Sequence, residues 1–113
     1  MRIDLHTHTL LSDGALLPKE LARRAAVMEH EAIAFTDHAS MSNIERVIRE
    51  AKKDAELASE WGIEVLAGCE LTHIPAAKMD SMVAAARRAG AEIIVVHGET
   101  VSEPVEKGTN HAA

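Results

Sequence analysis

Apolar residues along this chain fall into short continuous runs that alternate with longer stretches of helical period. The runs predict strands near residues 2–6, 31–37, 63–69 and 92–97. Runs this short are too brief for a typical helix. Continuous Val/Ile runs such as Ile93–Val96, flanked by helices, are typical of parallel strands that are buried on both faces.

The stretches between the runs predict three amphipathic helices. The first covers about residues 18–30 and begins with a proline, which is favoured in the first helical turn. The second follows a capping-box pattern at Ser42–Glu45, runs to about Trp61 and ends at Gly62. The third covers about residues 75–90 and ends at Gly90. Their apolar faces are predicted at Leu17, Leu21, Ala25 and Met28; at Ile44, Val47, Ile48, Ala51, Ala55 and Ala58; and at the core positions Met79, Met82, Val83 and Ala86.

The resulting order is a βα unit repeated three times, followed by a fourth strand. The residues at the strand ends, His6, His38, Glu70 and His97, are 32, 32 and 27 positions apart. This spacing suits a parallel βα array with right-handed crossovers. An open Rossmann-like sheet is an alternative, but no glycine-rich phosphate loop follows the first strand, so a barrel-like arrangement fits better. The tail, residues 98–113, has no strong period and is predicted to be irregular.

Composition narrows the class of protein. The 113 residues suffice for one small domain, and the formal net charge of −6 argues against non-specific binding to nucleic acid or to an anionic membrane. A single cysteine, Cys69, excludes an intrachain disulfide and suits a reducing compartment; we expect it to be a core residue. No apolar run approaches the roughly 20 residues of a membrane span, and no signal peptide is evident. We therefore expect a soluble, cytoplasmic protein.

The first strand carries the earliest candidate chemistry. His6 and His8 are two positions apart, so in an extended backbone both rings point to the same side. Asp13 lies in the loop just beyond them. Two imidazoles and a carboxylate would begin a metal site, whereas the alternative is a pair of histidines on an exposed strand face.

The other strands favour the metal site. Each ends in a further potential ligand: His38 after the second, Glu70 after the third and His97 after the fourth. In a parallel βα array all these ends open on one face, so we expect the side chains to converge there. A mixed set of histidines and carboxylates suits Zn or Mn and argues against a thiolate site.

Five segments together resemble a known family. They look like the first four motifs of the PHP (polymerase and histidinol phosphatase) superfamily, in its order and at its spacing, and the tail resembles a stand-alone histidinol-phosphatase-like branch. The segments are Asp4–His8, Ser12–Gly14, Thr36–His38, Gly68–Glu70 and His97–Gly98. The resemblance implies an α/β fold in which residues 1–113 form a single partial PHP domain, the N-terminal half of a distorted (βα)7 TIM-like barrel.

The same resemblance implies an activity and a site. Members hydrolyse phosphate esters, so a metal-dependent phosphoesterase acting on a small phosphate monoester is expected, with two or three divalent ions (Zn, Mn or Fe) and a metal-bound water as the nucleophile. Glu70 is expected to bridge two metals. The implied ligands are His6, His8, Asp13, His38, Glu70 and His97.

The sequence departs from the family pattern at its C-terminal end. The family completes its site with a further histidine and a late Asp-x-His, which this sequence lacks, and His111 is not expected to replace them. The chain would then represent roughly half of the barrel and could be inactive alone. A second hypothesis is therefore a non-catalytic metal-binding half-domain that pairs through exposed strand edges, as a homodimer or with a complementing C-terminal half. A third, a domain of a DNA polymerase, is disfavoured by the lack of basic surface.

Other polar residues have weaker claims on the site. Asp37 either orients a metal ligand from outside the coordination sphere or caps the following loop. His73 lies just past Glu70 on the same face and is a candidate for substrate contact. His30 falls at a helix C-terminus, where a structural role is expected.

Overall fold

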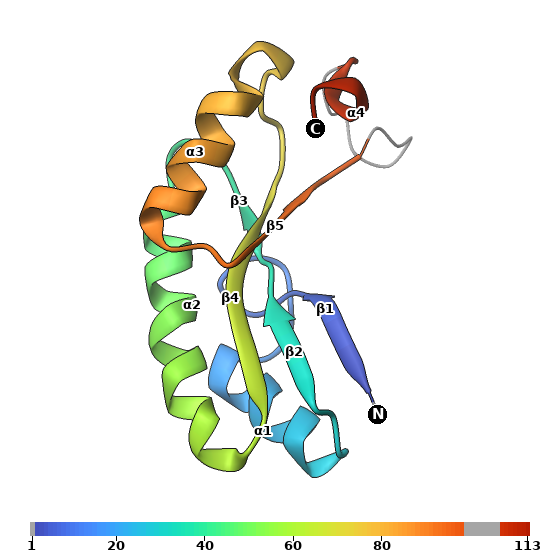
Figure 1. The fold of residues 1–113 in the computed structure, drawn as a ribbon, viewed down its shortest axis with the longest axis vertical. Coiled ribbons are helices and arrows are strands. Elements are labelled where there is room, and N and C mark those ends of the chain that lie inside the picture. The colour runs from blue at the N-terminus through green and yellow to red at the C-terminus, as the bar shows by residue number, and fades with distance from the viewer. Residues whose placement is uncertain (1, 99–106) are drawn as a thin grey trace.

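A computed structural model describes residues 2–98 and 107–113 (Figure 1). Short 3-10 turns at Ser59–Trp61 and Ala76–Lys78 follow the second helix and precede the third. The elements in chain order are β1 (Ile3–Thr7), α1 (Pro18–Val27), β2 (Ala32–Phe35), β3 (His38–Ala39), α2 (Ile44–Ala58), β4 (Glu64–Leu71), α3 (Met79–Ala89), β5 (Ile93–Val96) and α4 (Thr109–Ala112).

The strands form one parallel sheet wound in a single direction. β1 pairs with β2, β2 with β4, and β4 with β5, so strands that follow one another through a helix are also neighbours in space. The short β3 continues β2 along the same edge of β4: Ala32 lies opposite Glu64 and His38 opposite Glu70, the same offset in both pairs.

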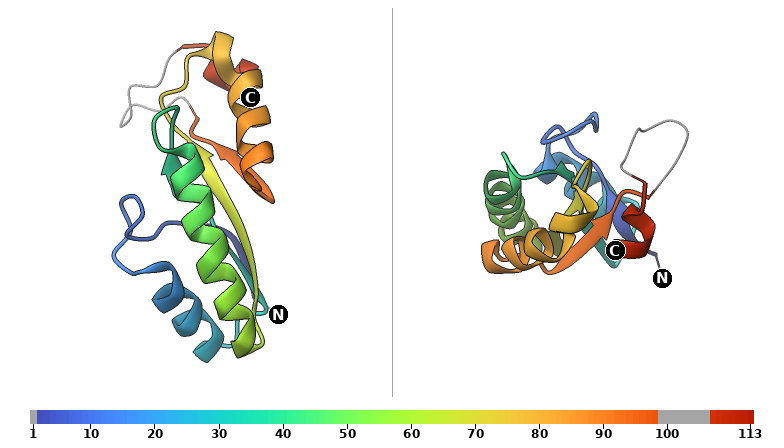
Figure 2. Two further views of the ribbon diagram at one scale, coloured as in Figure 1. Left: turned by 90° about the vertical axis from the view of Figure 1, so that its left-hand side faces the viewer. Right: turned by 90° about the horizontal axis from the view of Figure 1, so that it is seen from above.

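The helices α1, α2 and α3 cover one face of this sheet, and the strands curl around the other (Figure 2). A doubly wound Rossmann sheet would carry helices on both faces. The predicted half of a TIM-like barrel is therefore confirmed, and the open-sheet alternative is wrong.

Two apolar clusters lie between the helices and the sheet, and both α2 and β4 run through each of them. The upper cluster, near the C-terminal strand ends, includes Ile44, Val47, Ile48, Cys69, Leu71, Met79, Met82 and Ala86. The lower cluster includes Ala22, Ala25, Ile33, Phe35, Ala51, Ala55, Ala58, Ile63 and Ala67. Met79, Met82 and Cys69 are core residues, as predicted. Burial raises the pKa of the Cys69 thiol to about 11 against the opposing charge of Arg87.

β1 lies at an edge of the sheet. Ile3 is 53% and Leu5 44% exposed, because among the described residues β1 pairs with β2 alone.

The apolar face predicted for the first helix is wrong at its ends. Leu17 and Met28 are exposed because they occupy the N-cap and C-cap positions, outside the helix proper, and Ala22 and Ala25 fill the core instead.

The helix ends match the sequence only in part. The predicted capping box is not formed, since Asn43 is the N-cap residue of α2 and its Oδ1 accepts a hydrogen bond from the Ser40 backbone N–H at 2.9 Å. Gly62 and Gly90 do end their helices in the left-handed conformation, with φ of 75° and 107°.

The tail is not wholly irregular. α4 forms within it, with Thr109 buried and Ala112 packed against the upper cluster, while residues 99–106 lie outside the described part of the chain.

Gly68 permits a close approach of β4 to the start of β5. A Cβ there would lie 2.0 Å from the carbonyl oxygen of Ile93, so no other residue fits without moving the backbone.

Candidate metal centre

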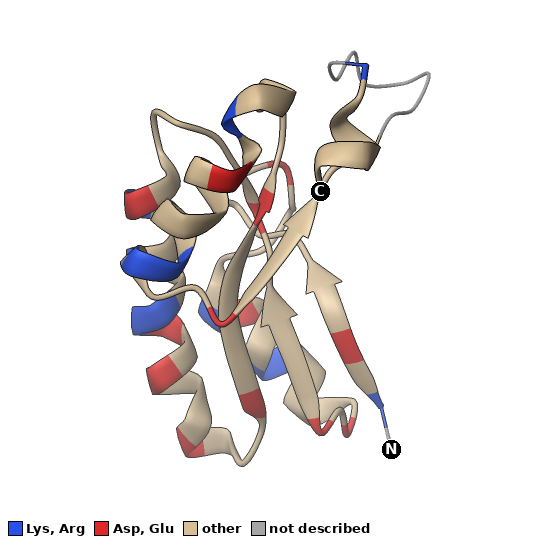
Figure 3. Cartoon of the chain, turned by 45° about the horizontal axis from the view of Figure 1, so that its top comes forward, with Lys and Arg blue, Asp and Glu red and all other residues tan. Residues whose placement is uncertain are grey.

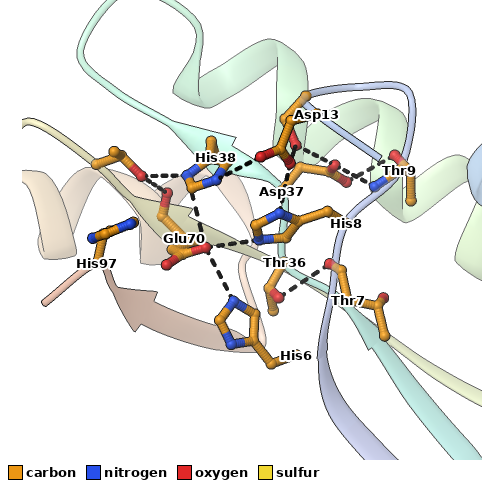
Figure 4. Close-up of polar contacts among 12 residues, drawn as sticks. His6, Thr7, His8, Thr9, Asp13, Thr36, Asp37, His38, Glu70 and His97 are labelled. Carbon is orange, nitrogen blue, oxygen red and sulfur yellow. Dashed lines mark hydrogen bonds and ion pairs between the residues drawn. The ribbon is translucent and has the colours of Figure 1, made fainter. Parts of the chain in front are cut away.

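Acidic and imidazole side chains from four strands gather where the strands end (Figure 4). β1 carries His6 and leads directly to His8, β3 begins with His38, β4 carries Glu70, and β5 leads to His97. The single-wound parallel sheet produces this gathering, because all its C-terminal ends open on one side. The predicted convergence of these residues is therefore present, although their role as metal ligands stays a prediction.

Glu70 lies at the centre of the cluster. Its Oε1 is 3.0 Å from His6 Nε2 and 2.7 Å from His8 Nε2, and His38 Nδ1 lies 3.7 Å away. Burial of the carboxyl group raises its pKa, but hydrogen bonds from His6 and His8 and the nearby His38 outweigh this, so the pKa is lowered overall. Glu70 is thus held as a carboxylate, the form that a cation requires.

Asp13 provides a second carboxylate on the solvent side. Its Oδ1 is 2.6 Å from His8 Nδ1, and its Oδ2 is 3.2 Å from His38 Nε2. Desolvation raises the pKa of Asp13, yet the hydrogen bond to His8 and the charges of His38 and His8 lower it overall. His8 therefore lies between two carboxylates, one at each ring nitrogen.

The loop that carries Asp13 depends on Gly14. A Cβ at Gly14 would lie 2.3 Å from the carbonyl oxygen of His8, and the Gly14 N–H donates to the Thr9 carbonyl at 2.8 Å. Only glycine allows the backbone to fold back this tightly. The Ser-Asp-Gly turn seen in the sequence thus returns Asp13 to the histidine that precedes it.

Two groups of side chains have the geometry to hold a divalent ion. The first group consists of His6, His8 and Glu70, and the second consists of His8, Asp13 and His38. Each residue offers one ligand atom, and the ligand atoms of a group lie within 4.8 Å of one another. Nitrogen and carboxylate oxygen ligands fit zinc, manganese or iron. The residues present therefore fit the expected metals, without fixing which metal or how many.

His97 stands beside these groups rather than in them. Its ring stacks on that of His38 at 5.8 Å between centroids, and its Nδ1 donates to the Gly98 carbonyl at 2.9 Å. That hydrogen bond places the proton on Nδ1 and leaves the Nε2 lone pair available. Its predicted role as a ligand stays untested.

Asp37 acts on the loop after β1. Its buried carboxylate accepts hydrogen bonds from the Thr9 N–H at 2.6 Å, from the Thr9 hydroxyl at 2.8 Å and from the Ser12 hydroxyl at 2.6 Å. The loop that it holds also carries His8 and Asp13. Asp37 therefore supports two ligand candidates of the first loop, whereas the sequence left open whether it oriented a ligand or capped the loop that follows it.

Two supporting residues were not predicted from the sequence. Thr72 lies 2.6 Å from His38 Nδ1 through its hydroxyl, and Thr9 anchors Asp37. Thr72 could have been found, because it follows Glu70 by two positions in an extended strand and so points to the same side. Thr9 could not, since its partner is 28 positions away.

A cavity of about 460 Å³ opens beside the cluster, lined in part by Asp13 and His38. His73, the residue predicted as a candidate for substrate contact, lies on the wall of this cavity. Its backbone has a positive φ of 57°. His111 lies in α4 and belongs to neither ligand group among the described residues. His30 is remote from the cluster in sequence, and its buried Nδ1 has no hydrogen-bond partner among the residues described.

Charged residues elsewhere are spread over helices, loops and strands (Figure 3). None of the described helices is both long and apolar enough to cross a bilayer.

The fold and the cluster together define a class of protein: an α/β half-barrel with a histidine–carboxylate centre at its strand ends. Comparison with known families identifies it further, since a family model described as PHP domain matches residues 4–97. The chain belongs to the PHP family. The resemblance predicted from the motifs is thereby confirmed, and the family is one of metal-dependent phosphoesterase type.

Individual relatives show how much of the family the chain represents. It is 53% identical over 115 residues to the uncharacterized protein MJ1295 of Methanocaldococcus jannaschii, a match that covers all of this chain and 53% of the relative. It is 36% identical over 72 residues to a 5'-3' exoribonuclease of Haemophilus influenzae, covering 63% of this chain and 23% of the relative. It is 37% identical over 70 residues to a 3',5'-nucleoside bisphosphate phosphatase of Chromobacterium violaceum, covering 62% and 22%. The chain thus spans about half, or less, of these relatives' lengths.

Proposed function

We propose that this chain forms the N-terminal part of a metal-dependent phosphoesterase, a hydrolase of small phosphate monoesters in the manner of a histidinol phosphatase. The observation that carries the proposal is the cluster in which Glu70 and Asp13 each contact two histidines across strand ends. The names of two relatives, a phosphatase and an exoribonuclease, support hydrolysis of a phosphate ester.

The carboxylates, the histidines and Thr72 would each have a different role in such a site. Divalent ions, when bound, polarise a phosphate oxygen and make a water nucleophilic near neutral pH. Glu70 and Asp13 supply the negative charge that balances the cations, with Glu70 proposed to lie between two of them. His6, His8 and His38 supply nitrogen ligands, and the Thr72 hydroxyl fixes the orientation of the His38 ring. We propose zinc, manganese or iron as the metal.

The substrate is proposed to be a small ester and not a nucleic acid. Some relatives are DNA polymerases and exoribonucleases, which act on polymers. In this chain the net charge is −6, and no lysine or arginine of the described residues lines the cavity beside the cluster. A polynucleotide would call for basic side chains along its phosphates. A cytoplasmic location without membrane contact is also proposed, in keeping with the single unpaired Cys69.

We further propose that the two sheet edges are covered by another segment. β1 exposes Ile3 and Leu5 at one edge, and β5 is only half-buried at the other. Because the chain spans 53% of its M. jannaschii relative, a C-terminal half of similar size would close the barrel and supply further ligands. A homodimer is the alternative, and without either the chain would be a non-catalytic metal-binding half-domain. Sedimentation velocity of the purified chain separates these, since a clean monomer at all concentrations would contradict the homodimer.

The main proposal is tested by metal content and turnover together. The purified chain, loaded with Mn²⁺ or Zn²⁺, is dialysed, its metal is measured by mass spectrometry, and hydrolysis of p-nitrophenyl phosphate is followed. His8→Ala and Glu70→Gln should each weaken metal binding at least about tenfold, and His111→Ala, outside the cluster, should leave it unchanged. Metal without turnover would favour the non-catalytic half-domain. If the chain binds no metal and hydrolyses no substrate, the proposal is wrong.

A further inference from the structure

The cavity beside the metal centre has walls that the proposed chemistry does not use. It measures about 460 Å³, within the usual range for small-ligand pockets. Asp13 and His38 form the side that faces the cluster. The remaining wall comes from the loop after β3, the start of α2 and the end of β4, and includes Ser40, Asn43 and His73.

The Ser40 hydroxyl and the Asn43 amide of this wall are uncharged donors and acceptors. Asn43 accepts from the Ser40 N–H through Oδ1, and this contact fixes the plane of its amide. Neither the Asn43 amide nitrogen nor the Ser40 hydroxyl makes a hydrogen bond with another residue that the structure describes, although both residues are only half-exposed. Thr72, by contrast, is engaged with His38 and with the Glu70 carbonyl. Two neutral groups on the wall are thus left to bind a ligand.

His73 adds an imidazole to the same wall at a conformational cost. It is one of two non-glycine residues with positive φ in the described chain, at 57°. Non-glycine residues adopt this region rarely, and such strain concentrates where a side chain must be presented. The strand end turns sharply there, directly after Thr72, and the turn brings His73 to the cavity.

The charge of the cavity selects against a second anionic group. Asp13 is its one carboxylate, and none of the described residues lining it is a lysine or an arginine. A second phosphate or a carboxylate on the ligand would find no lysine or arginine to pair with among these described lining residues. A hydroxyl-bearing, uncharged ligand would find donors and acceptors on the wall.

We propose that this cavity binds the alcohol part of the substrate, and that this part is an uncharged, hydroxyl-bearing group such as a small polyol. The proposal rests on the phosphoesterase function above: the phosphate lies at the metal centre and the alcohol extends toward Ser40, Asn43 and His73. It names the substrate class, a monophosphate of a neutral polar alcohol, and disfavours bisphosphates.

Isothermal titration of the Mn²⁺-loaded chain tests this without depending on turnover. The probes are inorganic phosphate, ethyl phosphate and glycerol 1-phosphate, which share the phosphate and differ in hydroxyl groups. Glycerol 1-phosphate should bind roughly five- to tenfold more tightly than ethyl phosphate, the gain expected for one or two hydrogen bonds. Ser40→Ala and His73→Gly should each reduce that ratio by at least about half. Ser42→Ala changes a serine two positions from Ser40 that does not line the cavity, and it should preserve the ratio.

The outcomes separate the two proposals. His73→Gly keeps the backbone conformation accessible, and thermal unfolding checks that each variant is folded. If inorganic phosphate binds but the two esters bind equally, or if both wall variants keep the full ratio, the cavity proposal is wrong and the phosphoesterase function stands. If the loaded chain binds no inorganic phosphate, the phosphoesterase function fails and the cavity proposal fails with it.

Discussion

Replacing Asp37 by alanine should unfold the chain at markedly lower denaturant. The carboxylate is buried and accepts three hydrogen bonds, from the Thr9 N–H, the Thr9 hydroxyl and the Ser12 hydroxyl. Hydrogen bonds to charged groups contribute about 1.5–3 kcal/mol each. Part of that sum is offset, because the variant no longer buries a charge, so a loss of about 3–5 kcal/mol is expected.

Asp37→Asn should be milder and more informative. It keeps one carbonyl oxygen for the Thr9 N–H and the Ser12 hydroxyl, while its amide can donate to a rotated Thr9 hydroxyl. We expect a loss of about 1–2 kcal/mol of stability. Metal affinity should nevertheless fall about tenfold, because the loop that carries His8 and Asp13 is held less rigidly.

Urea unfolding followed by circular dichroism measures the stability. With a slope of about 1.5 kcal/mol/M, the alanine variant should shift the midpoint down by about 2–3 M or be unfolded in buffer. Asp4→Ala is the matched control: Asp4 is exposed and accepts one hydrogen bond, from the His6 N–H at 3.1 Å, so its change should stay within about 0.5 kcal/mol. An Asp37→Ala variant within about 1 kcal/mol of the parent would refute the reasoning.

Three further results are expected. Gly68→Ala should separate β4 from β5 and cost at least about 3 kcal/mol, because its Cβ would meet the Ile93 carbonyl at 2.0 Å; a thermal midpoint unchanged within error would contradict this. The Cys69 thiol, with a pKa of about 11, should resist a disulfide reagent at pH 7.5 until the chain is unfolded in guanidinium, and rapid labelling of the native chain would count against its burial. The folded-state pKa values of Asp13 and Glu70 lie below their unfolded values, so the stability they provide is complete above about pH 4.5 and is lost as the pH falls through the folded values. Urea midpoints of the metal-free chain from pH 7 to 3 should show that loss, and Glu70→Gln should flatten it.

The sequence predicted the features that a local pattern determines, such as the position of a strand and the end of a helix. Apolar runs gave the strand positions to within a few residues, and glycines at positions 62 and 90 gave two helix ends. The ligand candidates were found for the same reason, since each follows an apolar run and parallel strands bring their ends together. The glycine turn after His8 was visible as well, although its tight return to the histidine was not.

The sequence did not predict features that depend on contacts between residues far apart in the chain. The exposure of Ile3 and Leu5 follows from the edge position of β1, which no local pattern records. The three bonds to Asp37 join residues at least 25 positions apart. The N-cap residue of α2 is Asn43, one position after the Ser42 of the capping-box pattern, and the Asn43 side chain accepts a hydrogen bond from the Ser40 N–H. The pattern alone does not distinguish between these two neighbouring polar residues.

The continuity of α2 through both apolar clusters has a consequence for cooperativity. Its first turns pack in the upper cluster through Val47 and Ile48, and its last turns pack in the lower cluster through Ala55 and Ala58. Neither cluster can open without exposing half of a single helix, so the two should melt in one transition. A ligand that tightens the strand ends would then protect backbone amides at the far end of the molecule, in β2 and α1, where it makes no contact.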